Sequence, residues 1–291
     1  QHALADRLVY STVRKGLGGN IKFLVSGGGS LSAALSATFL GMGIDIVEGY
    51  GLTETSPVVT INVVEDLRPG TLGYPVTELE TRLDTGVVDG MEFPEADGPV
   101  GELLVAGPNV ADGYWKDPGA TGRAFIERDG KRWFRTGDII ERTDDDFLVY
   151  HDRLKQLLVL STGKNVAPQP IEDLFSTDDR IEQVMVVGDG RKFVGALVVP
   201  NVAEIARLAE KHGVDLPEDP EEWCDDERVR AWIQEAIDAG NERLERIERI
   251  KAFELVTREW TVDNDLLTPS MKKKRHNIHE EFRPKVETLY E

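Results

Sequence analysis

The sequence predicts an α/β architecture followed by an α+β architecture, with a small antiparallel β unit between them. Residues 1–67 alternate helical and strand patterns, which is typical of a parallel α/β layer. Residues 68–150 contain short strands separated by Gly, Pro and Asp turns, which favours an antiparallel sheet. Residues 156–291 mix strands with capped helices, which indicates a separate α+β domain of ordinary size. Residues 151–155 would link the two parts.

The α/β layer begins with a helix that is expected to run from Gln1 to Lys15. A strand at 21–25, a glycine-rich turn, a helix at 31–40 and a strand at 44–48 follow it. In the β unit, residues 102–106 and 138–141 are the clearest strand candidates.

The final domain is expected to contain strands at 157–160, 184–187, 193–199 and 253–256. Asn201 is a suitable cap for a helix that Gly213 would end. A second helix is expected after Asp219, because Asp219, Pro220 and Glu222 supply a cap, a first-turn proline and a third-position acid.

The composition is strongly acidic, with 34 Lys and Arg against 53 Asp and Glu and a net charge of −19. This charge repels phosphate backbones and anionic lipid, which excludes nucleic-acid and membrane-surface binding by bulk charge. The acids are spread along the whole chain, so we expect a halophilic protein from a salt-rich cytoplasm. The single cysteine, Cys224, cannot form an intramolecular disulfide, and no apolar run reaches the roughly 18 residues of an integral membrane segment.

Two turns could carry chemistry. Residues 26–30 (SGGGS) lie between a strand and a helix. Their glycines have no side chains, so a ligand could approach the backbone closely. Residues 49–57 (GYGLTETSP) follow the next strand, at the end of the sheet where open α/β folds bind ligands. Glu54 lies beside hydroxyls and could hold Mg²⁺, which takes few protein ligands. Taken alone, either segment could also be a polar turn without a ligand.

Five ordered segments resemble motifs of the adenylate-forming (AMP-binding) enzymes, which include acyl-CoA synthetases, luciferases and peptide-synthetase adenylation domains. They are residues 49–57, residues 101–103 with 113–115, residues 133–138 (WFRTGD), residues 152–164 (DRLKQLLVLSTGK) and residues 266–275 (LLTPSMKKKR). Residues 161–170 and 260–272 look most like long-chain fatty acyl-CoA synthetases. On this resemblance, residues 1–150 are the C-terminal part of the large AMP-binding domain, residues 151–155 are the hinge and residues 156–291 are the lid domain.

The resemblance implies a nucleotide site in the large domain. Asp138 would accept the ribose hydroxyls of ATP, and Arg153 would donate near the ribose or a phosphate. Tyr50 would stack beside adenine, and Gly28 and Gly29 would line the acyl and adenine sites.

The resemblance also implies roles in the reaction. Thr53 would contact the α-phosphate or the acyl carboxylate, and Glu54 would bind Mg²⁺. Lys272 would bridge the attacking carboxylate and the α-phosphate. Lys155 would be the pivot of the small domain, and Gly163 would lie beside the pantetheine tunnel for CoA.

Simpler interpretations exist for two of these residues. Without its flanking motif, Asp138 could merely cap a turn. Lys272 belongs to a basic cluster, residues 272–275, that in isolation resembles a solvated patch on an acidic protein. The neighbouring His276 and His279 have no third fixed ligand, so a solvated surface suits them better than a metal site.

The implied substrates are a fatty acid, ATP and CoA, which would yield acyl-AMP and then acyl-CoA. The phosphate loop of the family, which ends in a Lys, does not occur in these 291 residues, and the sequence starts at Gln1. We therefore expect a fragment that lacks the N-terminal half of the large domain and is inactive alone. The alternatives are a non-catalytic nucleotide-binding or scaffold chain, and a ligase that loads a carrier protein from acyl-AMP.

Molar KCl is expected to stabilise the folded chain, because salt screens the repulsion among its 53 acidic residues. The Debye length falls to about 3 Å at 1 M salt. The melting temperature should therefore rise between roughly 0.1 and 2 M KCl, a range chosen to span that screening. A melting temperature that stays flat or falls over this range would contradict the halophilic interpretation.

Overall fold

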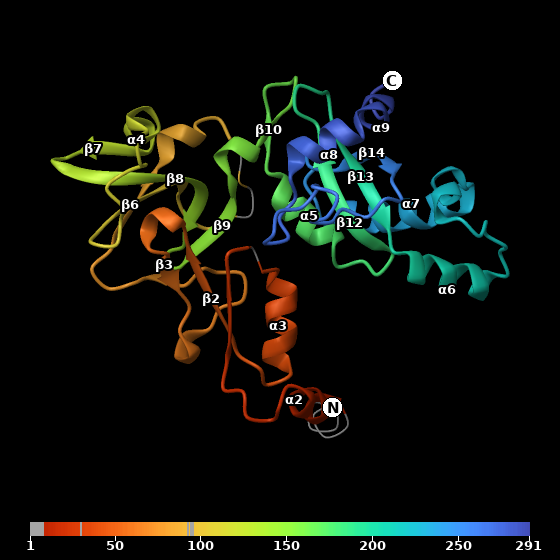
Figure 1. Ribbon diagram of the computed structural model, residues 1–291, viewed down its shortest axis with the longest axis horizontal. Coiled ribbons are helices and arrows are strands. Elements are labelled where there is room, and N and C mark those ends of the chain that lie inside the picture. The colour runs from red at the N-terminus through yellow and green to blue at the C-terminus, as the bar shows by residue number, and fades with distance from the viewer. Residues whose placement is uncertain (1–8, 30, 92, 94–95) are drawn as a thin grey trace. The chain divides into compact units, whose positions relative to one another are not determined.

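The structure, a computed structural model, describes residues 9–29, 31–91, 93 and 96–291. The chain forms two compact units, Gln1–Lys155 and Gln156–Glu291 (Figure 1). The boundary follows Lys155, the residue that the resemblance marks as a pivot, and movement at this residue stays a prediction. No helix in the described part of the chain is both long and apolar enough to cross a membrane.

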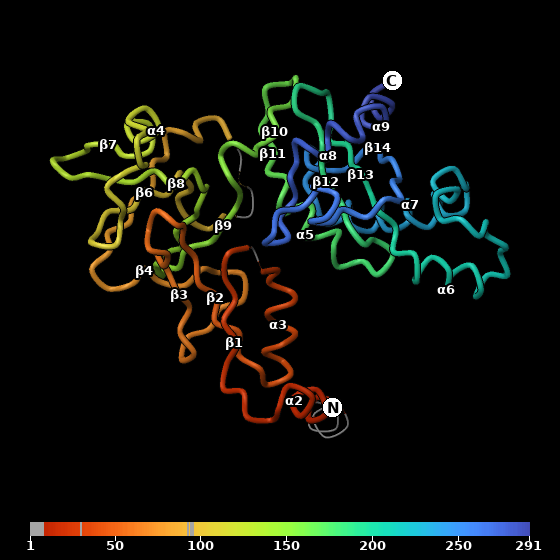
Figure 2. Tube along the Cα trace, viewed as in Figure 1, coloured from red at the N-terminus to blue at the C-terminus, as the bar shows by residue number. Residues whose placement is uncertain are grey.

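The first unit opens with a four-stranded sheet of order β1-β2-β3-β4. Its strands are Leu24–Gly27, Ile46–Gly51, Val58–Ile61 and Tyr74–Pro75, and helices α2 (Ser11–Gly16) and α3 (Ala33–Gly41) precede β1 and β2. β1 and β2 are parallel neighbours (Figure 2). The predicted α/β alternation is confirmed, with strands that begin slightly later than predicted. Of the helix predicted from Gln1 to Lys15, residues 1–8 lie outside the described residues.

The two strands predicted in this layer are parallel, but the sheet as a whole is mixed, because β3 and β4, which were not predicted, run antiparallel to their neighbours. Only residues 52–57 connect β2 to β3, and they include the short 3-10 helix Thr53–Thr55. A parallel connection needs a crossover of a dozen or more residues, so this short loop forces the chain to reverse. The reversal places residues 52–57 at the carboxyl end of β2.

Much of the apolar surface of this layer is exposed. Val25 of β1 is 66% exposed and Leu35 of α3 is 47% exposed, and Phe23 and Leu40 are also exposed. In the described residues, β1 pairs with β2 alone. These exposed apolar side chains are candidates for contact with a further segment.

A five-stranded antiparallel sheet confirms the predicted β unit. Its strands are β5 (Glu80–Asp84), β6 (Val100–Ala106), β7 (Phe125–Arg128), β8 (Lys131–Arg142) and β9 (Leu148–Arg153), and α4 (Pro118–Ala124) precedes β7. β8 pairs with β6 along its length, with β7 through residues 131–134 and with β9 through residues 138–142. Asp138 therefore lies where the pairing of β8 with β7 has ended and its pairing with β9 begins.

The second unit is built on a three-stranded sheet of order β12-β13-β14. β12 (Ile181–Val187) and β13 (Val194–Pro200) are antiparallel, and β13 and β14 (Ile250–Leu255) are parallel. β10 (Leu158–Val159) and β11 (Asn165–Val166) form a separate short hairpin. The helices are α5 (Pro168–Phe175), α6 (Val202–His212), α7 (Glu227–Asn241), α8 (Arg275–Glu281) and α9 (Arg283–Thr288). The predicted α+β architecture is confirmed.

Successive side chains of β12 reach two different apolar cores, because side chains alternate between the faces of a strand. Val184 and Val186 belong to the core that contains α5, α6 and α7. Met185 and Val187 belong to the core that contains Trp260 and α8. The sheet is covered on both faces, which explains why its strands are nearly continuous apolar runs.

The capping prediction for α6 is confirmed. The Asn201 side chain accepts a hydrogen bond from Glu204 N at 3.1 Å, and Gly213 ends the helix in the left-handed region with a φ of 64°.

The single helix predicted after Asp219 is wrong, because two elements occupy this stretch. Asp219 caps the 3-10 helix η6 (Pro220–Asp225). Asp226 then adopts an extended conformation and caps α7 by accepting from the amides of Arg228 and Val229. The second capping carboxylate interrupts the helix, since a cap residue has a non-helical backbone.

Candidate functional site

Three predicted nucleotide-binding side chains converge at one point of the first unit. Tyr50 comes from β2, Asp138 from β8 and Arg153 from the end of β9. The Tyr50 hydroxyl donates to Asp138 Oδ2 at 2.6 Å, and Arg153 Nε donates to Asp138 Oδ1 at 2.8 Å. The fold thus brings together residues from three separate sequence motifs.

The Asp138 carboxylate keeps acceptor capacity for a ligand. Its side chain is buried, and each carboxylate oxygen receives one of the two hydrogen bonds above. An ionised carboxylate offers about four acceptor positions, two on each oxygen. Each oxygen can therefore accept one further hydrogen bond, which suits a pair of adjacent hydroxyls.

Tyr50 is fixed as a donor toward Asp138. Burial, together with the charge and the hydrogen bond of Asp138, raises the pKa of Tyr50 well above its usual value. The phenol therefore stays protonated at neutral pH. Its hydrogen bond holds the aromatic ring beside the carboxylate.

A bend in β8 at Gly137 sets the direction of the Asp138 side chain. Gly137 has a φ of 72°, in the left-handed region that favours glycine. Thr136 Oγ1 donates to Leu103 O at 2.9 Å and accepts from Asp138 N at 3.1 Å. The bend and these two hydrogen bonds fix where the Asp138 side chain leaves the strand.

An ion pair between a half-buried arginine and a buried glutamate supports the same bend. Arg135 Nε and Nη2 donate to Glu102 Oε2 at 2.9 and 2.5 Å, and Gly137 N donates to Glu102 Oε1 at 3.1 Å. Glu102 is 2% exposed. Sequence reasoning gave Glu102 and Arg135 no role. A charged residue inside each of two apolar strand segments was the available signal, because buried charges are almost always paired.

Glu54 is held from two sides. The Tyr114 hydroxyl donates to Glu54 Oε1 at 2.7 Å, and Ala111 N donates to Glu54 O at 2.8 Å. Desolvation and the hydrogen bond to Glu54 raise the pKa of Tyr114 to about 12, so Tyr114 stays a donor. Thr53 is exposed and Glu54 is half-buried, so both side chains are accessible. Tyr114 belongs to a motif in the sequence but received no role there.

The turn that carries Thr53 and Glu54 is tightly constrained. Thr55 is fully buried, and its hydroxyl donates to Pro57 O at 2.6 Å and accepts from Leu52 N at 3.0 Å. A Cβ on Gly51 would lie 1.7 Å from Pro57 O. This close approach of two backbone segments requires glycine at position 51.

Glu54 is compatible with Mg²⁺ but not with a closed metal cage. In residues 9–29, 31–91, 93 and 96–291, no three His, Cys, Asp or Glu side chains form a group that could hold a metal ion. Mg²⁺ usually binds through one or two carboxylates and completes its shell with water and substrate phosphates. One accessible carboxylate therefore fits this ion.

The two glycine-containing turns are neighbours. Gly27 pairs in register with Gly49, so the residues after β1 and after β2 lie at the same edge of the sheet. Gly28 has a φ of 82°, and a Cβ on Gly28 or Gly29 would meet no atom within 4 Å. Ser30, the last residue of the first turn, lies outside the described residues. The positions of Gly28 and Gly29 leave their backbone open to a ligand.

Glu48 is a buried acid beside these turns that pairs with no cation among the described residues. It is 6% exposed and precedes Gly49 in β2. Burial raises the pKa of Glu48 to about 7, although the amide of Leu31 donates to it and partly opposes the shift. The carboxyl group is therefore poised to titrate near neutral pH.

Lys272 and Gly163 belong to the second unit. Lys272 is exposed. Its neighbours are engaged, since Lys273 and Arg275 pair with Glu172 and Lys274 pairs with Asp265. Gly163 has a φ of 81° in the turn between β10 and β11. Lys272 is thus the member of the basic cluster that makes no ion pair in the described part of the structure.

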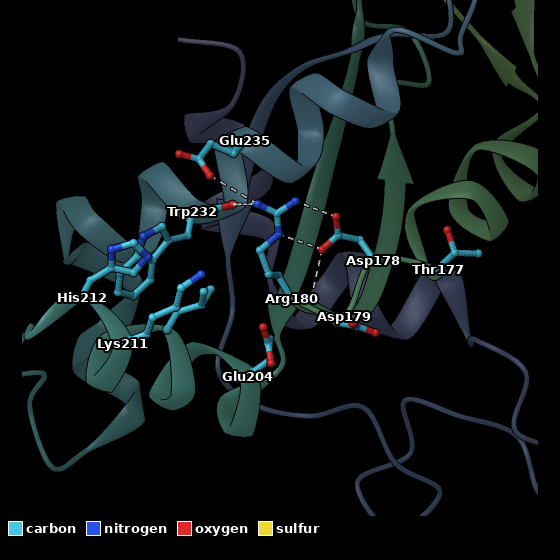
Figure 3. Close-up of a pocket in the computed structure, with 10 residues that line it drawn as sticks. Thr177, Asp178, Asp179, Arg180, Glu204, Lys211, His212, Trp232 and Glu235 are labelled. Atoms are coloured by element: carbon cyan, nitrogen blue, oxygen red, sulfur yellow. Dashed lines mark hydrogen bonds and ion pairs between the residues drawn. The ribbon is translucent and has the colours of Figure 1, made fainter. Parts of the chain in front are cut away.

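A cavity of about 500 Å³ lies in the second unit between α6, α7 and the turn before β12 (Figure 3). Arg180 occupies its centre and donates to both oxygens of Asp178, at 2.8 and 2.7 Å, and to Trp232 O at 3.1 Å. The cavity contains none of the predicted site residues, and its arginine is already neutralised. We therefore do not assign the site to it.

The chain belongs to the family of AMP-binding enzymes. Residues 2–115 match the family model described as AMP-binding enzyme, and residues 155–291 match that of the AMP-binding enzyme C-terminal domain. This family membership confirms the resemblance seen in the sequence motifs.

Among curated proteins, the chain is 37% identical over 290 residues to long-chain-fatty-acid–CoA ligase FadD15 of Mycobacterium tuberculosis. It is 34% identical over 295 residues to human long-chain-fatty-acid–CoA ligase 1. These alignments cover 100% and 99% of this chain but 45% and 41% of the relatives. The chain therefore spans less than half the length of the curated relatives it matches.

Solved adenylation domains share the fold. The chain superimposes with a TM-score of 0.77 on that of a carboxylate reductase from Mycobacterium chelonae, covering 99% of this chain and 41% of the other. The TM-score is 0.76 for a carboxylic acid reductase domain from Segniliparus rugosus in complex with AMP and a carboxylic acid, with 99% and 44% covered. Both are 25% identical to this chain.

Glu48→Gln should flatten the dependence of stability on pH. Because the folded pKa of about 7 exceeds the ordinary glutamate value of 4.5, the contribution of Glu48 is fully present below about pH 4.5 and is lost as pH rises through 7. The wild type should lose roughly 2 kcal/mol of unfolding free energy over this range relative to the variant. Urea unfolding at several pH values between about 5 and 8 measures this.

Glu65→Gln, at an exposed glutamate, is the matched control and should follow the wild-type profile. If Glu48→Gln also runs parallel to the wild type, Glu48 does not titrate in this way.

Proposed function

We propose that this chain is the C-terminal portion of an ATP-dependent long-chain fatty acid:CoA ligase. The observation that carries the proposal is the convergence of Tyr50 and Arg153 on the buried carboxylate of Asp138, which keeps two acceptor positions. The identity of 37% to a long-chain-fatty-acid–CoA ligase supports the substrate class. The complete enzyme would join a fatty acid to CoA at the expense of ATP, with AMP and pyrophosphate as products.

The nucleotide would bind at the carboxyl ends of β1 and β2. Asp138 would accept the two ribose hydroxyls, and Arg153 would donate near the ribose or the α-phosphate. The ring of Tyr50, fixed by its hydrogen bond to Asp138, would stack beside adenine. Gly28 and Gly29, whose surroundings are open, would line the adenine and acyl sites.

The reacting carboxylate and phosphate would lie near the turn after β2. The exposed Thr53 hydroxyl would donate to the α-phosphate or to the acyl carboxylate. Glu54, oriented by Tyr114, would hold Mg²⁺. The ion would neutralise charge on the phosphates of ATP while pyrophosphate leaves.

Lys272 would assist the first half-reaction. An oxygen of the fatty acid carboxylate attacks the α-phosphorus of ATP, and the bond to the leaving pyrophosphate breaks. The Lys272 ammonium would lie between the attacking carboxylate and the α-phosphate and offset the negative charge that develops there. Its exposure and its lack of an ion pair among the described residues suit this role.

The second half-reaction would use the same acyl-AMP. The sulfur of CoA attacks the acyl carbon, and AMP leaves. We propose that the lid domain, residues 156–291, pivots about Lys155 between the two half-reactions, a gating motion of the kind common in such enzymes. Gly163 would then lie beside the pantetheine arm of CoA.

The N-terminal half of the large domain would be the partner of the exposed apolar layer. Val25, Phe23 and Leu35 are exposed on β1, the segment before it and α3. The relatives are more than twice as long as this chain. A segment that covers these side chains would also supply the phosphate loop that the sequence lacks.

We place the protein in a salt-rich cytoplasm. The net charge of −19 supports a halophilic origin. The single cysteine is free and buried, which suits a reducing compartment.

A ligase that loads a carrier protein is the second candidate. A solved neighbour with a TM-score of 0.73 and 25% identity is the A-PCP didomain of a carboxylic acid reductase in complex with AMP. The greater identity to CoA ligases favours CoA as the acceptor. A non-catalytic scaffold would retain the nucleotide-binding residues but would have no use for an unpaired Lys272.

Mass spectrometry of the full-length protein with ATP, fatty acid and CoA tests these functions together. Acyl-CoA as product supports the CoA ligase. Acyl-AMP that accumulates and is discharged only by a carrier protein supports the second candidate. ATP binding without either product would indicate a scaffold.

The 291 residues alone should make no acyl-AMP and bind ATP weakly or not at all. The β- and γ-phosphates carry most of the charge of ATP and would face water and a chain of net charge −19. Adding the upstream half, fused or in trans, should restore both properties. The measurement is pyrophosphate exchange with nucleotide titration, and turnover by the isolated chain would refute the proposal.

In the full-length protein, Lys272→Ala should lower the rate of acyl-AMP formation by about 100-fold, because one preorganised cation is lost from the transition state. Conversion of synthetic acyl-AMP and CoA to acyl-CoA should survive. Pyrophosphate exchange and thioester formation measure the two steps separately.

The matched control is Lys274→Ala, since Lys274 is already paired with Asp265. It should keep near wild-type pyrophosphate exchange. Wild-type exchange in Lys272→Ala would mean that another residue supplies the cation.

A further inference from the structure

The buried carboxylate of Glu172 anchors the segment that carries Lys272. Glu172 lies in α5 and is 1% exposed. Lys273 Nζ lies 2.5 Å from its Oε2, and Arg275 places Nη1 2.8 Å from Oε1 and Nη2 2.9 Å from Oε2. Val186 N donates to Oε1 at 2.8 Å. One carboxylate therefore receives three hydrogen bonds and a further ion-pair contact from Arg275 Nη1.

Burial keeps Glu172 away from any substrate. Its side chain is 1% exposed, and its oxygens face Lys273, Arg275 and the amide of Val186. A buried charge persists only when it is paired and hydrogen-bonded, and it holds its partners in defined positions. Glu172 therefore holds its neighbours in place and does not itself react.

The carboxylate joins elements from opposite faces of the sheet. α5 packs into one core of the second unit, and α8 packs into the other. β12 is an edge strand, and Glu172 accepts the amide of Val186 at that edge. Figure 1 shows α5 and α8 beside β12. The ion pairs of Glu172 with Lys273 and Arg275 thus connect the C-terminal segment that contains α8 to α5, at the edge of the sheet formed by β12.

Residues 266–274 form a small hairpin. Leu267 and Lys273 make an antiparallel bridge, and Lys274 N donates to Leu266 O at 2.9 Å. Thr268 N donates to Lys272 O at 2.8 Å, and Lys272 N donates to Thr268 Oγ1 at 3.0 Å. The backbone of Lys272 is fixed on both sides by this hairpin.

The side chains of the basic cluster point in different directions. In the hairpin, Lys273 reaches the buried Glu172, while Lys272 is exposed and Lys274 reaches the exposed Asp265. Successive side chains of an extended segment point to opposite sides, so drawing Lys273 inward turns Lys272 outward. Arg275, the first residue of α8, reaches the same carboxylate.

We propose that Glu172 is the positioning residue for Lys272, and that its two ion pairs fix the hairpin from which the Lys272 ammonium reaches the reacting groups. This inference rests on the proposed adenylation function. A catalytic group must be held within a fraction of an ångström of its productive position, and a long lysine side chain on an untethered hairpin would not meet this requirement.

Glu172→Gln in the full-length protein tests the inference. The glutamine amide keeps an oxygen for Val186 N but loses the charge that holds Lys273 and Arg275. Acyl-AMP formation should fall by about 10-fold to 100-fold, as expected for a misplaced catalytic group. Thioester formation from synthetic acyl-AMP and CoA should change by less than about 3-fold, because Lys272 acts only in the first step.

The matched control is Asp265→Asn, which removes the ion pair of Lys274 at the exposed side of the same hairpin. Asp265 has a φ of 62°, a conformation that asparagine tolerates well. Acyl-AMP formation by this variant should stay within about 3-fold of the wild type, less than the loss expected from a misplaced group. Equal losses in both half-reactions of Glu172→Gln would indicate a merely structural role and overturn the inference.

Hydrogen exchange supplies a readout that does not depend on activity. In Glu172→Gln, the amides of Lys272 and Lys274 should exchange at least about 10-fold faster, while the amide of Ile233 in the core of α7 keeps its protection. Unchanged exchange at Lys272 would overturn the inference even if acyl-AMP formation falls. If the wild type makes no acyl-AMP, the proposed function fails, and exchange still decides whether Glu172 holds the hairpin.

Lys273→Met is the second variant, for use if Glu172→Gln does not fold. It leaves the contacts of Glu172 with Arg275 and Val186 in place and removes one anchor. Slower acyl-AMP formation with intact use of acyl-AMP is expected, together with faster exchange at Lys272. Wild-type values for both measurements would contradict the positioning role.

Discussion

A buried carboxylate must replace its lost water with donors, and this constraint fixes the segments that carry the proposed site residues. Removing an ionised carboxylate from water costs several kcal/mol unless cations and N–H groups surround it. Glu102, Asp138 and Glu172 are each almost fully buried, and each pairs with an arginine. Glu102 accepts a hydrogen bond from Gly137 N at the bend of β8. Asp138 binds Tyr50 and Arg153 in the proposed ribose site. Glu172 pairs with Lys273 of the hairpin that carries Lys272.

Glu48 shows what happens when burial is not matched by a cation. Its exposed fraction of 6% is close to that of the other three. It has an amide from Leu31, but no arginine or lysine in the described part of the chain pairs with it, and burial raises its pKa to about 7. Glu172, by contrast, is paired with Lys273 and Arg275.

The groups proposed to react are exposed, while the residues around them are fixed. Thr53 and Lys272 are both exposed. The turn of Thr53 is held by the buried Thr55 and by the close packing of Gly51 on Pro57. The hairpin of Lys272 is held by Glu172. A rigid support under an accessible side chain lowers the cost of orienting it toward a substrate.

Local pattern was sufficient to predict the succession of helices and strands, the caps of α6 and the motifs of the AMP-binding family, because these features depend on neighbours within a few residues. Local pattern failed at Asp226, where two capping acids compete for one helix, and in the first sheet, where loop length decided strand direction. Only the tertiary structure decided which acids are buried with a cation. Glu102, Tyr114 and Glu172 meet partners that are far away in the sequence, and these partners decide whether the desolvation cost of a buried charge is offset.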